Sequence, residues 1–340
     1  MMGKILDLAN LFSRFTPARF MNALLVIVSY YLSRMMGKPI VWGMPVSIAL
    51  EPTTACNLRC PQCPSGLKSF TRDTGNIKSA TLEKALTDIG KTALYANLYF
   101  QGEPYIHKDF LKMVSMAKQA GLYTATSTNA HFIDDEIAKQ TIRSGLDRLI
   151  ISLDGLTQES YSTYRIGGEL EKVIRGTRLL VKWKKELRSK TPYLIFQFLL
   201  TSHNEHEVSQ AKTFADTIGV DEIRFKTAQV YDFQDGNALI PKNPAFTRYR
   251  QTENGKYLIK NKLYNHCWRM WQSPVITWDG FAVPCCFDKD ASYRFGNINR
   301  SDFRSIWFSE PYMDFRKKIF RDRAELDICK NCSEGTRIFT

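Results

Sequence analysis

Short apolar segments alternate with longer amphipathic ones between residues 46 and 232. The short segments are typical of buried strands and cover Val46–Leu50, Leu94–Phe100, Tyr123–Ser127, Arg148–Leu153, Leu194–Leu200 and Glu222–Lys226. Helical periodicity occupies Leu82–Ile89, Phe110–Ala120, Asp135–Ser144, Leu170–Arg188 and Glu205–Ile218. Strands that are each followed by a helix predict a parallel α/β sheet, curved into a full or partial barrel. Functional residues of such barrels gather at the carboxyl ends of the strands.

The pattern differs on either side of this core, which predicts a division into residues 1–45, 46–232 and 233–340. The first part is a basic, helical segment around the apolar run Ala23–Leu32. A helix this apolar must be covered, either by the main domain or by a membrane interface in which its flanking Arg and Lys meet anionic headgroups. The last part is loop-rich, with a hairpin predicted around Asp279-Gly280. We expect it to form a small second domain without a large core of its own.

Composition adds charge and redox context. The 340 residues are 44% apolar, and Lys plus Arg exceed Asp plus Glu by 47 to 34, so the net charge of +13 attracts anions without selecting one kind. No apolar stretch reaches the ~18 residues of a membrane-spanning helix. The chain also shows no secretory signal, so we expect a cytoplasmic protein whose thiols are reduced. Its eight cysteines then indicate metal binding rather than disulfides.

Three cysteines lie in the loop that leaves the first predicted strand, as Cys56-x3-Cys60-x2-Cys63. A structural zinc site or a closed iron–sulfur cluster needs four protein ligands. A trio that binds a [4Fe–4S] cluster leaves one iron open to a substrate or cofactor. The alternatives are a zinc site completed by His107 or His131 and a thioredoxin-like dithiol, which leaves Cys56 unexplained.

Four further cysteines form a complete ligand set: Cys267, Cys285, Cys329 and Cys332. The predicted hairpin returns Cys285 to the side from which Cys267 departs, and a C-x2-C turn supplies the other two. Four thiolates close a site, so this cluster would be structural or would relay electrons, and a zinc ribbon is the alternative. Cys286 is left over, and we expect it to be a small buried side chain.

The Cys56-x3-Cys60-x2-Cys63 loop resembles the signature of the radical S-adenosylmethionine (radical SAM) enzymes. The resemblance implies a partial (β/α)6 barrel and a [4Fe–4S] cluster whose open iron binds S-adenosylmethionine (SAM). It also implies reductive cleavage of SAM to a 5′-deoxyadenosyl radical that abstracts hydrogen from a substrate. An external low-potential donor would supply the electron.

Further motifs extend the resemblance to SAM contacts. Gly102-Glu103-Pro104 resembles the family motif that binds the methionine amino group, and ribose or carboxylate contacts are implied at Thr128, Asn129, Ser152, Asp154 and Gln197. The chain departs from the family at Gln101, where the motif has a glycine. It also departs at Gln62, where an aromatic residue often precedes the third cysteine.

The carboxyl-terminal part resembles the SPASM/Twitch extension of radical SAM enzymes. The matching residues are Cys267, Gly280-x4-Cys285, Phe295-Gly296-Asn297-Ile298, Ile306-Trp307 and Phe315-Arg316. The full SPASM form uses seven cysteines and two auxiliary clusters. This chain has too few, so the resemblance implies the shorter, Twitch-like form with one auxiliary [4Fe–4S] cluster that accepts an electron from the substrate radical.

Three classes of function follow. The first is a radical SAM oxidoreductase acting on an unidentified peptide or small molecule, with Lys226 and Arg165 as candidate substrate contacts or, equally, as solvated or ion-paired structural residues. The second is a transferase or modifying enzyme that reaches a lipid or membrane-associated substrate through residues 1–45, which would make the protein peripheral to the membrane. The third is a zinc- or RNA-binding module, but the chain lacks aromatic RNA-binding signatures, so no nucleic acid partner is expected.

Overall fold

The computed structural model describes residues 2–332. Eight strands form one sheet in the order β10-β9-β1-β2-β3-β4-β5-β6, and two more, β7 and β8, form a separate hairpin. The strands are β1 Ser47–Leu50, β2 Tyr95–Asn97, β3 Tyr123–Thr128, β4 Arg148–Ser152, β5 Tyr193–Leu200, β6 Glu222–Thr227, β7 Tyr249–Gln251, β8 Tyr257–Ile259, β9 Val275–Ile276 and β10 Ala282–Val283. The α-helices are α1 Met2–Phe12, α2 Pro17–Met36, α3 Pro64–Leu67, α4 Ser79–Ile89, α5 Phe110–Gln119, α6 Asp135–Arg143, α7 Gln158–Tyr164, α8 Leu170–Glu186, α9 Val208–Ile218, α10 Arg269–Gln272, α11 Phe303–Trp307, α12 Glu310–Asp322 and α13 Asp327–Lys330. Short 3-10 turns are η1 Pro104–Ile106, η2 Glu205–Glu207, η3 Pro244–Phe246 and η4 Arg323–Glu325.

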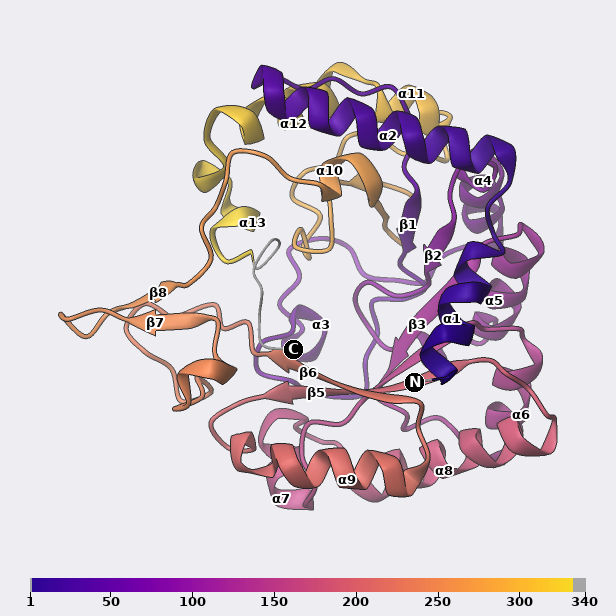
Figure 1. The fold of residues 1–340 in the computed structure, drawn as a ribbon, viewed down its shortest axis with the longest axis vertical. Helices are drawn as coiled ribbons and strands as arrows, with labels where there is room; N and C mark the ends of the chain where they lie inside the picture. Colours follow the sequence, from indigo (N-terminus) through magenta and orange to yellow (C-terminus); the bar gives the residue numbers. More distant parts are fainter. Residues whose placement is uncertain (1, 333–340) are drawn as a thin grey trace.

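Strands β1 to β6 are parallel neighbours in chain order, and the sheet curves with its helices on the outside (Figure 1). The predicted fold class, a partial barrel of parallel strands followed by a small cysteine-rich part, is confirmed. Two details were wrong. Strand β2 ends at Asn97 rather than Phe100, because the chain leaves the sheet there to form the loop of Gly102 and Glu103. Strand β6 is followed by irregular chain and the β7–β8 hairpin instead of a sixth helix.

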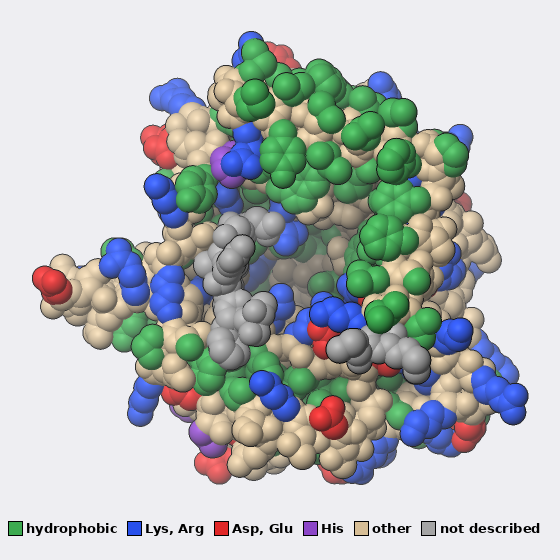
Figure 2. Space-filling model, viewed as in Figure 1, with side chains coloured by type: hydrophobic (Ala, Val, Ile, Leu, Met, Phe, Trp, Pro, Cys, Tyr) green, Lys and Arg blue, Asp and Glu red, His purple; other side chains and the backbone are tan. Residues whose placement is uncertain are grey.

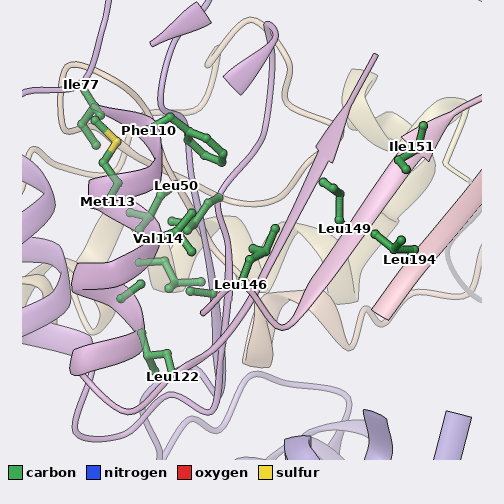
Figure 3. Packing of buried hydrophobic residues seen from close by; sticks show 14 of the residues in the cluster. Leu50, Ile77, Phe110, Met113, Val114, Leu122, Leu146, Leu149, Ile151 and Leu194 are labelled. Atoms are coloured by element: carbon green, nitrogen blue, oxygen red, sulfur yellow. The ribbon is translucent and has the colours of Figure 1, made fainter. Parts of the chain in front are cut away.

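The main core fills the space between the sheet and the helices outside it. On α5, Phe110, Met113 and Val114 lie at helical spacing and pack toward the sheet (Figure 3). On β4, Leu149 and Ile151 belong to the same core. Because side chains alternate along a strand, the residues between and after them, including Ser152, face the inside of the barrel. The inner surface is therefore available for polar groups.

The predicted hairpin around Asp279-Gly280 is present, with Gly280 at a φ of +92°. It does not stand apart from the barrel, however. Strand β9 pairs in parallel with β1, and the Glu51 carboxylate after β1 accepts a hydrogen bond from the Trp278 backbone N–H at 3.2 Å. Some side chains of this part, such as Trp307, join the main core, whereas others, such as Trp271 and Phe315, form a second cluster with Val26 and Tyr30 of α2.

Residues 2–36 form two helices joined at a sharp bend. Thr16 caps α2 by accepting a hydrogen bond from the Arg19 backbone N–H, and Pro17 occupies its first turn. Within the described residues, no single helix is long and apolar enough to cross a membrane. Together, α1 and α2 reach the required length and composition, but they meet at 96°.

Candidate functional site

The three-cysteine loop lies directly after β1, at the carboxyl end of that strand. Its thiols are free, with Cys60 buried and Cys56 and Cys63 partly exposed. Helix α3 follows Cys63 and lies against Cys60. The approach is so close that a Cβ on Gly66 would lie 2.6 Å from the Cys60 backbone nitrogen. The backbone thus packs tightly on one side of the loop and leaves two thiols accessible on the other.

Gly102 brings the Gly102-Glu103-Pro104 motif into close contact with the three-cysteine loop. Its φ is +74°, and a Cβ there would lie 2.4 Å from the Thr53 carbonyl oxygen and 2.8 Å from that of Ala55. The Gly102 backbone N–H donates to Ser65 Oγ at 2.9 Å, and the Glu103 backbone N–H donates to the Ala55 carbonyl at 2.7 Å. Only glycine fits this position, because both the backbone conformation and the space exclude a side chain.

The Glu103 carboxylate is buried at the centre of the site. It accepts hydrogen bonds from Thr128 Oγ1 at 2.8 Å, from the Asn129 backbone N–H at 2.7 Å and from the Tyr105 backbone N–H at 3.2 Å. Desolvation by burial nevertheless raises the pKa of Glu103 to about 7, since these three donors compensate only in part. Pro104 begins the turn η1 immediately afterwards and fixes the direction of the chain.

Asn129 connects Glu103 to the cysteine loop. Its side-chain Nδ2 donates to Asn57 Oδ1 at 2.8 Å and lies 4.0 Å from Cys56 Sγ. Burial is the main cause that raises the pKa of Cys56 to about 11, and Glu103 adds to it. Because metal-binding thiols must be deprotonated, binding of a metal cluster to this loop would release protons.

A second buried charge lies after β4. The Asp154 carboxylate accepts a hydrogen bond from the Leu199 backbone N–H at 2.8 Å and an ion-paired one from Arg165 Nε at 2.5 Å. The guanidinium of Arg165 also lies 3.7 Å from Cys60 Sγ. Arg165 is therefore part of the cysteine site, where sequence analysis had left it as either a substrate contact or an ion-paired structural residue. Its only sequence signal is its place after the fourth strand, shortly before Gly167.

Ser152 and Gln197 are paired across β4 and β5 on the inner face of the barrel. Ser152 is buried and Gln197 is partly exposed. The structure thus brings Glu103, Thr128 and Asn129 into contact with one another around the cysteine loop. Ser152 and Gln197 lie in a neighbouring row of the same inner surface.

The two histidines considered as a fourth zinc ligand use both ring nitrogens elsewhere. His131 Nε2 accepts a hydrogen bond from the Glu169 backbone N–H at 2.8 Å, and its Nδ1 lies 2.9 Å from the Asn129 carbonyl. His107 Nδ1 accepts from the Asp109 backbone N–H at 3.1 Å, and its Nε2 lies 3.2 Å from a carbonyl oxygen. Neither ring presents a nitrogen to the three thiols.

Three of the four cysteines of the second group lie near the buried guanidinium of Arg323. All four side chains are buried: Cys267, Cys285, Cys329 and Cys332. Arg323 Nη2 lies 3.3 Å from Cys332 Sγ, while its Nη1 donates to the His266 carbonyl at 3.1 Å. Burial acts to lower the pKa of Arg323, but the neighbouring thiols outweigh it and raise that pKa. One internal cation is thus available to balance thiolate charge.

Cys286 lies next to this group but is exposed, so the expectation that it is buried was wrong. Cys285 is buried, whereas Cys286 lies in the turn that follows β10 and faces solvent.

The donor sets fit iron–sulfur clusters. Within residues 2–332, no three potential ligands converge on a point as a single metal ion requires. An iron–sulfur cluster spreads its thiolates over different iron atoms, so that convergence is not needed. A trio of thiols beside a buried carboxylate, and a set of four, three of them near a cation, are chemically suited to an open cluster and a closed one.

Comparison with known proteins decides the family. A family model described as the radical SAM superfamily matches residues 50–209, and one described as an iron–sulfur cluster-binding domain, SPASM, matches residues 267–333. The chain thus carries a radical SAM domain followed by a SPASM domain. As a radical SAM protein with a SPASM domain, it uses SAM, a SAM-binding [4Fe–4S] cluster and auxiliary iron–sulfur chemistry. The resemblance inferred from the cysteine spacing is confirmed.

Individual relatives agree with this assignment. Over 299 residues, the radical SAM protein is 28% identical to a tungsten-containing aldehyde ferredoxin oxidoreductase cofactor-modifying protein of Pyrococcus furiosus. The match covers 78% of this chain and 82% of the relative. Its fold is similar to that of BtrN in complex with AdoMet and 2-DOIA, with a TM-score of 0.53, 17% identity and coverage of 87% and 95%. It is also similar to Streptococcus suis SuiB bound to S-adenosylmethionine, with a TM-score of 0.63, 14% identity and coverage of 86% and 73%.

Proposed function

We propose that this protein is an oxidoreductase that cleaves SAM reductively and removes hydrogen from a peptide or a small polar molecule. The observation that carries the proposal is the buried Glu103 carboxylate, held by Thr128 and by Asn129, whose side chain lies 4.0 Å from Cys56 Sγ. When bound, a reduced [4Fe–4S] cluster and SAM supply a carbon-centred radical able to break a C–H bond. The protein's own task is to hold these groups in place and exclude water.

Each side chain around the first site has a proposed role. Cys56, Cys60 and Cys63 would hold the cluster by their thiolates. Glu103 would accept hydrogen bonds from the ammonium group of SAM, because a buried carboxylate with a raised pKa is stabilised by an approaching cation. Arg165 offers a guanidinium beside Cys60 that suits the SAM carboxylate.

The remaining predicted SAM contacts differ in what supports them. Asp154 holds Arg165 and the β5 backbone, so its proposed role is to position that guanidinium. Thr128 and Asn129 orient Glu103. For Ser152 and Gln197, ribose contacts stay a proposal supported by their place on the inner face.

The auxiliary site is proposed to hold one [4Fe–4S] cluster through Cys267, Cys285, Cys329 and Cys332. Burial of all four thiols favours a closed site that passes electrons rather than one that binds substrate. A buried Arg323 would stabilise the more negative, reduced cluster. An electron acceptor in this place suits a net two-electron oxidation, with an external low-potential donor serving the first site. The thiols suit a cytoplasmic, reducing location.

Relatives support a peptide or a small polar substrate. Streptococcus suis SuiB has been solved bound to the precursor peptide SuiA, and BtrN in complex with 2-DOIA. A lipid or membrane-associated substrate is the second candidate, because α1 and α2 expose apolar side chains. These helices contact the amino ends of the strands, however, whereas the cysteine loop follows a carboxyl end. We therefore favour a substrate that enters from water.

Anaerobic reconstitution with iron and sulfide tests the proposal. We expect about eight irons per chain, from two [4Fe–4S] clusters, and 5′-deoxyadenosine after dithionite is added. Replacing Cys56, Cys60 and Cys63 by Ala should abolish SAM cleavage, whereas Cys329→Ala should reduce iron by about half and spare much of that cleavage.

Cys286→Ala is the matched control, because this exposed cysteine belongs to neither proposed ligand set. It should leave iron content and SAM cleavage unchanged. Loss of SAM cleavage in the control alone, or full cleavage without the three loop thiols, would overturn the proposed ligand assignment.

A further inference from the structure

Helix α2 has its polar and apolar faces reversed relative to an ordinary surface helix. It buries four polar side chains, those of Arg19, Asn22, Ser29 and Ser33, together with those of Val26 and Tyr30. The opposite side carries apolar residues at helical spacing, among them Leu24 and Ile27. An amphipathic helix at the surface of a globular protein normally buries its apolar stripe.

Hydrogen bonds fix this orientation. The Arg19 guanidinium donates to the carbonyl oxygens of Gly90, Ala120 and Gly121 at 2.6 to 2.8 Å. The Asn22 side chain exchanges two hydrogen bonds of 2.9 and 2.8 Å with the Met44 backbone. Turning the apolar face inward would leave these buried polar groups without partners, at a cost of about 1–3 kcal/mol each.

The outward side chains of α1 and α2 form one continuous apolar surface, visible across both helices in Figure 2. Its most exposed members are Met35, Phe12, Ile5 and Phe20, each at least 60% exposed. Isolated exposed apolar residues are normal on proteins, but a contiguous patch of this kind marks an interaction site. We call it the apolar face of α1 and α2.

The exposed charged side chains of residues 2–45 are all basic, although Lys4 also lies near Glu222 of β6. Lys4 lies near the start of α1, and Arg34 and Lys38 lie at the end of α2, all exposed. Asp7 is the one acidic residue among residues 1–45, and it is buried, where it accepts hydrogen bonds from Tyr123 and Arg148. Basic side chains at both ends of an apolar face complement a surface that is apolar inside and anionic outside.

Helix α1 and the first half of α2 lie along the amino edge of the sheet, whereas Tyr30, in the second half of α2, packs against Trp268 and Trp271. Gly90 and Gly121, which Arg19 contacts, precede β2 and β3, and Asp147, which Asn10 contacts at 2.6 Å, precedes β4. The three-cysteine loop and Glu103 follow the carboxyl ends of β1 and β2. The two surfaces are therefore at opposite ends of the barrel.

We propose that the apolar face of α1 and α2 docks the protein on an anionic lipid membrane. The bend of 96° suits helices that lie in the interface, with apolar side chains in the acyl region and Lys4, Arg34 and Lys38 at the headgroups. The docked protein directs its SAM site away from the bilayer. The contact is an anchor, separate from substrate chemistry, and does not depend on the proposed function.

Vesicle co-sedimentation of the full chain tests the proposal. The probes are vesicles of phosphatidylcholine alone and of phosphatidylcholine mixed equally with phosphatidylglycerol, and the wild-type protein should bind the anionic ones more tightly. Leu24→Glu should weaken that binding roughly tenfold or more, because a leucine transferred out of the interface loses its apolar burial. Lys38→Gln should weaken it about fivefold, on anionic vesicles only.

Leu258→Glu is the matched control. Leu258, on β8, and Leu24 are both 44% exposed, so the two substitutions disturb folding to a similar extent. The control should bind vesicles like the wild type, and both variants should keep the wild-type melting temperature and SAM cleavage. Equal loss in the two variants would overturn the proposal, as would failure of the wild type to bind anionic vesicles.

The other candidate occupant is a second copy of the chain. Sedimentation velocity of the wild type and of Leu24→Glu decides this case. A wild-type dimer that Leu24→Glu converts to a monomer, together with weak vesicle binding, would mean that a second copy covers the apolar face and would overturn the membrane proposal. A monomeric wild type that binds anionic vesicles supports it.

Discussion

Replacing Glu103 by Gln tests the electrostatics of the SAM site. Burial raises the pKa of the Glu103 carboxyl to about 7, although hydrogen bonds from Thr128 and from the backbone of Asn129 partly compensate. The ammonium group of SAM would stabilise the ionised carboxylate but not the protonated carboxyl. SAM affinity should therefore depend on the ionised fraction of Glu103, and hence on pH, in the wild-type protein.

The size of the effect follows from that pKa. With a pKa near 7, the ionised fraction changes roughly tenfold between about pH 8 and pH 6, and SAM affinity should fall by the same factor. Glu103→Gln should bind SAM roughly 10- to 100-fold more weakly at pH 8, since a hydrogen bond to a charged group contributes about 1.5–3 kcal/mol. Its affinity should then stay nearly constant down to pH 6. Anaerobic calorimetric titration of cluster-loaded protein measures both quantities.

The pH dependence of the free energy of unfolding, measured without SAM, provides a second test, and it should run in the opposite direction. The folded pKa of Glu103 lies above the 4.5 of a free glutamate, so the folded state binds more protons than the unfolded state between these values. The free energy of unfolding should therefore fall as pH rises from about 4.5 to about 7 and then level off. Glu103→Gln should lack this part of the decline.

Glu159→Gln provides the control, because Glu159 is an exposed carboxyl in the first turn of α7. It should keep the wild-type pH profiles of affinity and stability. The reasoning fails if wild type and Glu103→Gln show parallel affinity profiles between pH 6 and pH 8, since the titrating group would then be another one.

Three further substitutions test other contacts. Gly102→Ala places a Cβ 2.4 Å from the Thr53 carbonyl at a φ of +74°, so we expect a loss of about 2 kcal/mol or more in denaturant unfolding and reduced iron in the first site. Arg72→Met leaves the buried Glu51 carboxylate without its two hydrogen bonds of 2.8 and 2.5 Å and should destabilise the protein by about 3–5 kcal/mol, which Glu51→Gln in the same chain should partly reverse. Arg323→Gln removes the cation beside Cys332, so the auxiliary cluster should become harder to reduce, whereas the first cluster keeps its potential in an EPR-monitored titration.

Periodicity predicted the barrel well, because short strand segments alternate along the chain with amphipathic helices that cover the outside of the sheet. It failed where pairing partners are distant. Strand β9 has two residues, and nothing in Val275–Ile276 signals that they pair with β1, more than 200 residues earlier. The reversed orientation of α2 was equally hidden, because it depends on carbonyl oxygens at Gly90, Ala120 and Gly121 that only the folded chain brings to Arg19.

In the candidate site, too, features that are local in sequence could be predicted, whereas contacts that depend on the fold could not. Cysteine spacing and the Gly102-Glu103-Pro104 motif are local in sequence, so they could be identified before the fold was known. Arg72, by contrast, forms its ion pair with Glu51 across a loop, and no motif marks it. A single arginine among many carries no signal of its own. Only its burial beside a carboxylate distinguishes it from the solvated ones.

The two ends of the barrel would keep the proposed membrane contact apart from the cysteine loop. At the carboxyl ends of the strands, the buried Asp154 carboxylate is ion-paired with Arg165, and the buried Glu103 carboxylate accepts hydrogen bonds from Thr128 and Asn129. At the amino ends, the Arg19 guanidinium donates hydrogen bonds to three backbone carbonyls that lie before β2 and β3. These bonds hold α2 with its apolar side facing outward. Because the same strands separate the two ends, a substitution such as Leu24→Glu can remove the anchor without reaching the cofactor site. Membrane docking and SAM cleavage should therefore vary independently among variants of this chain.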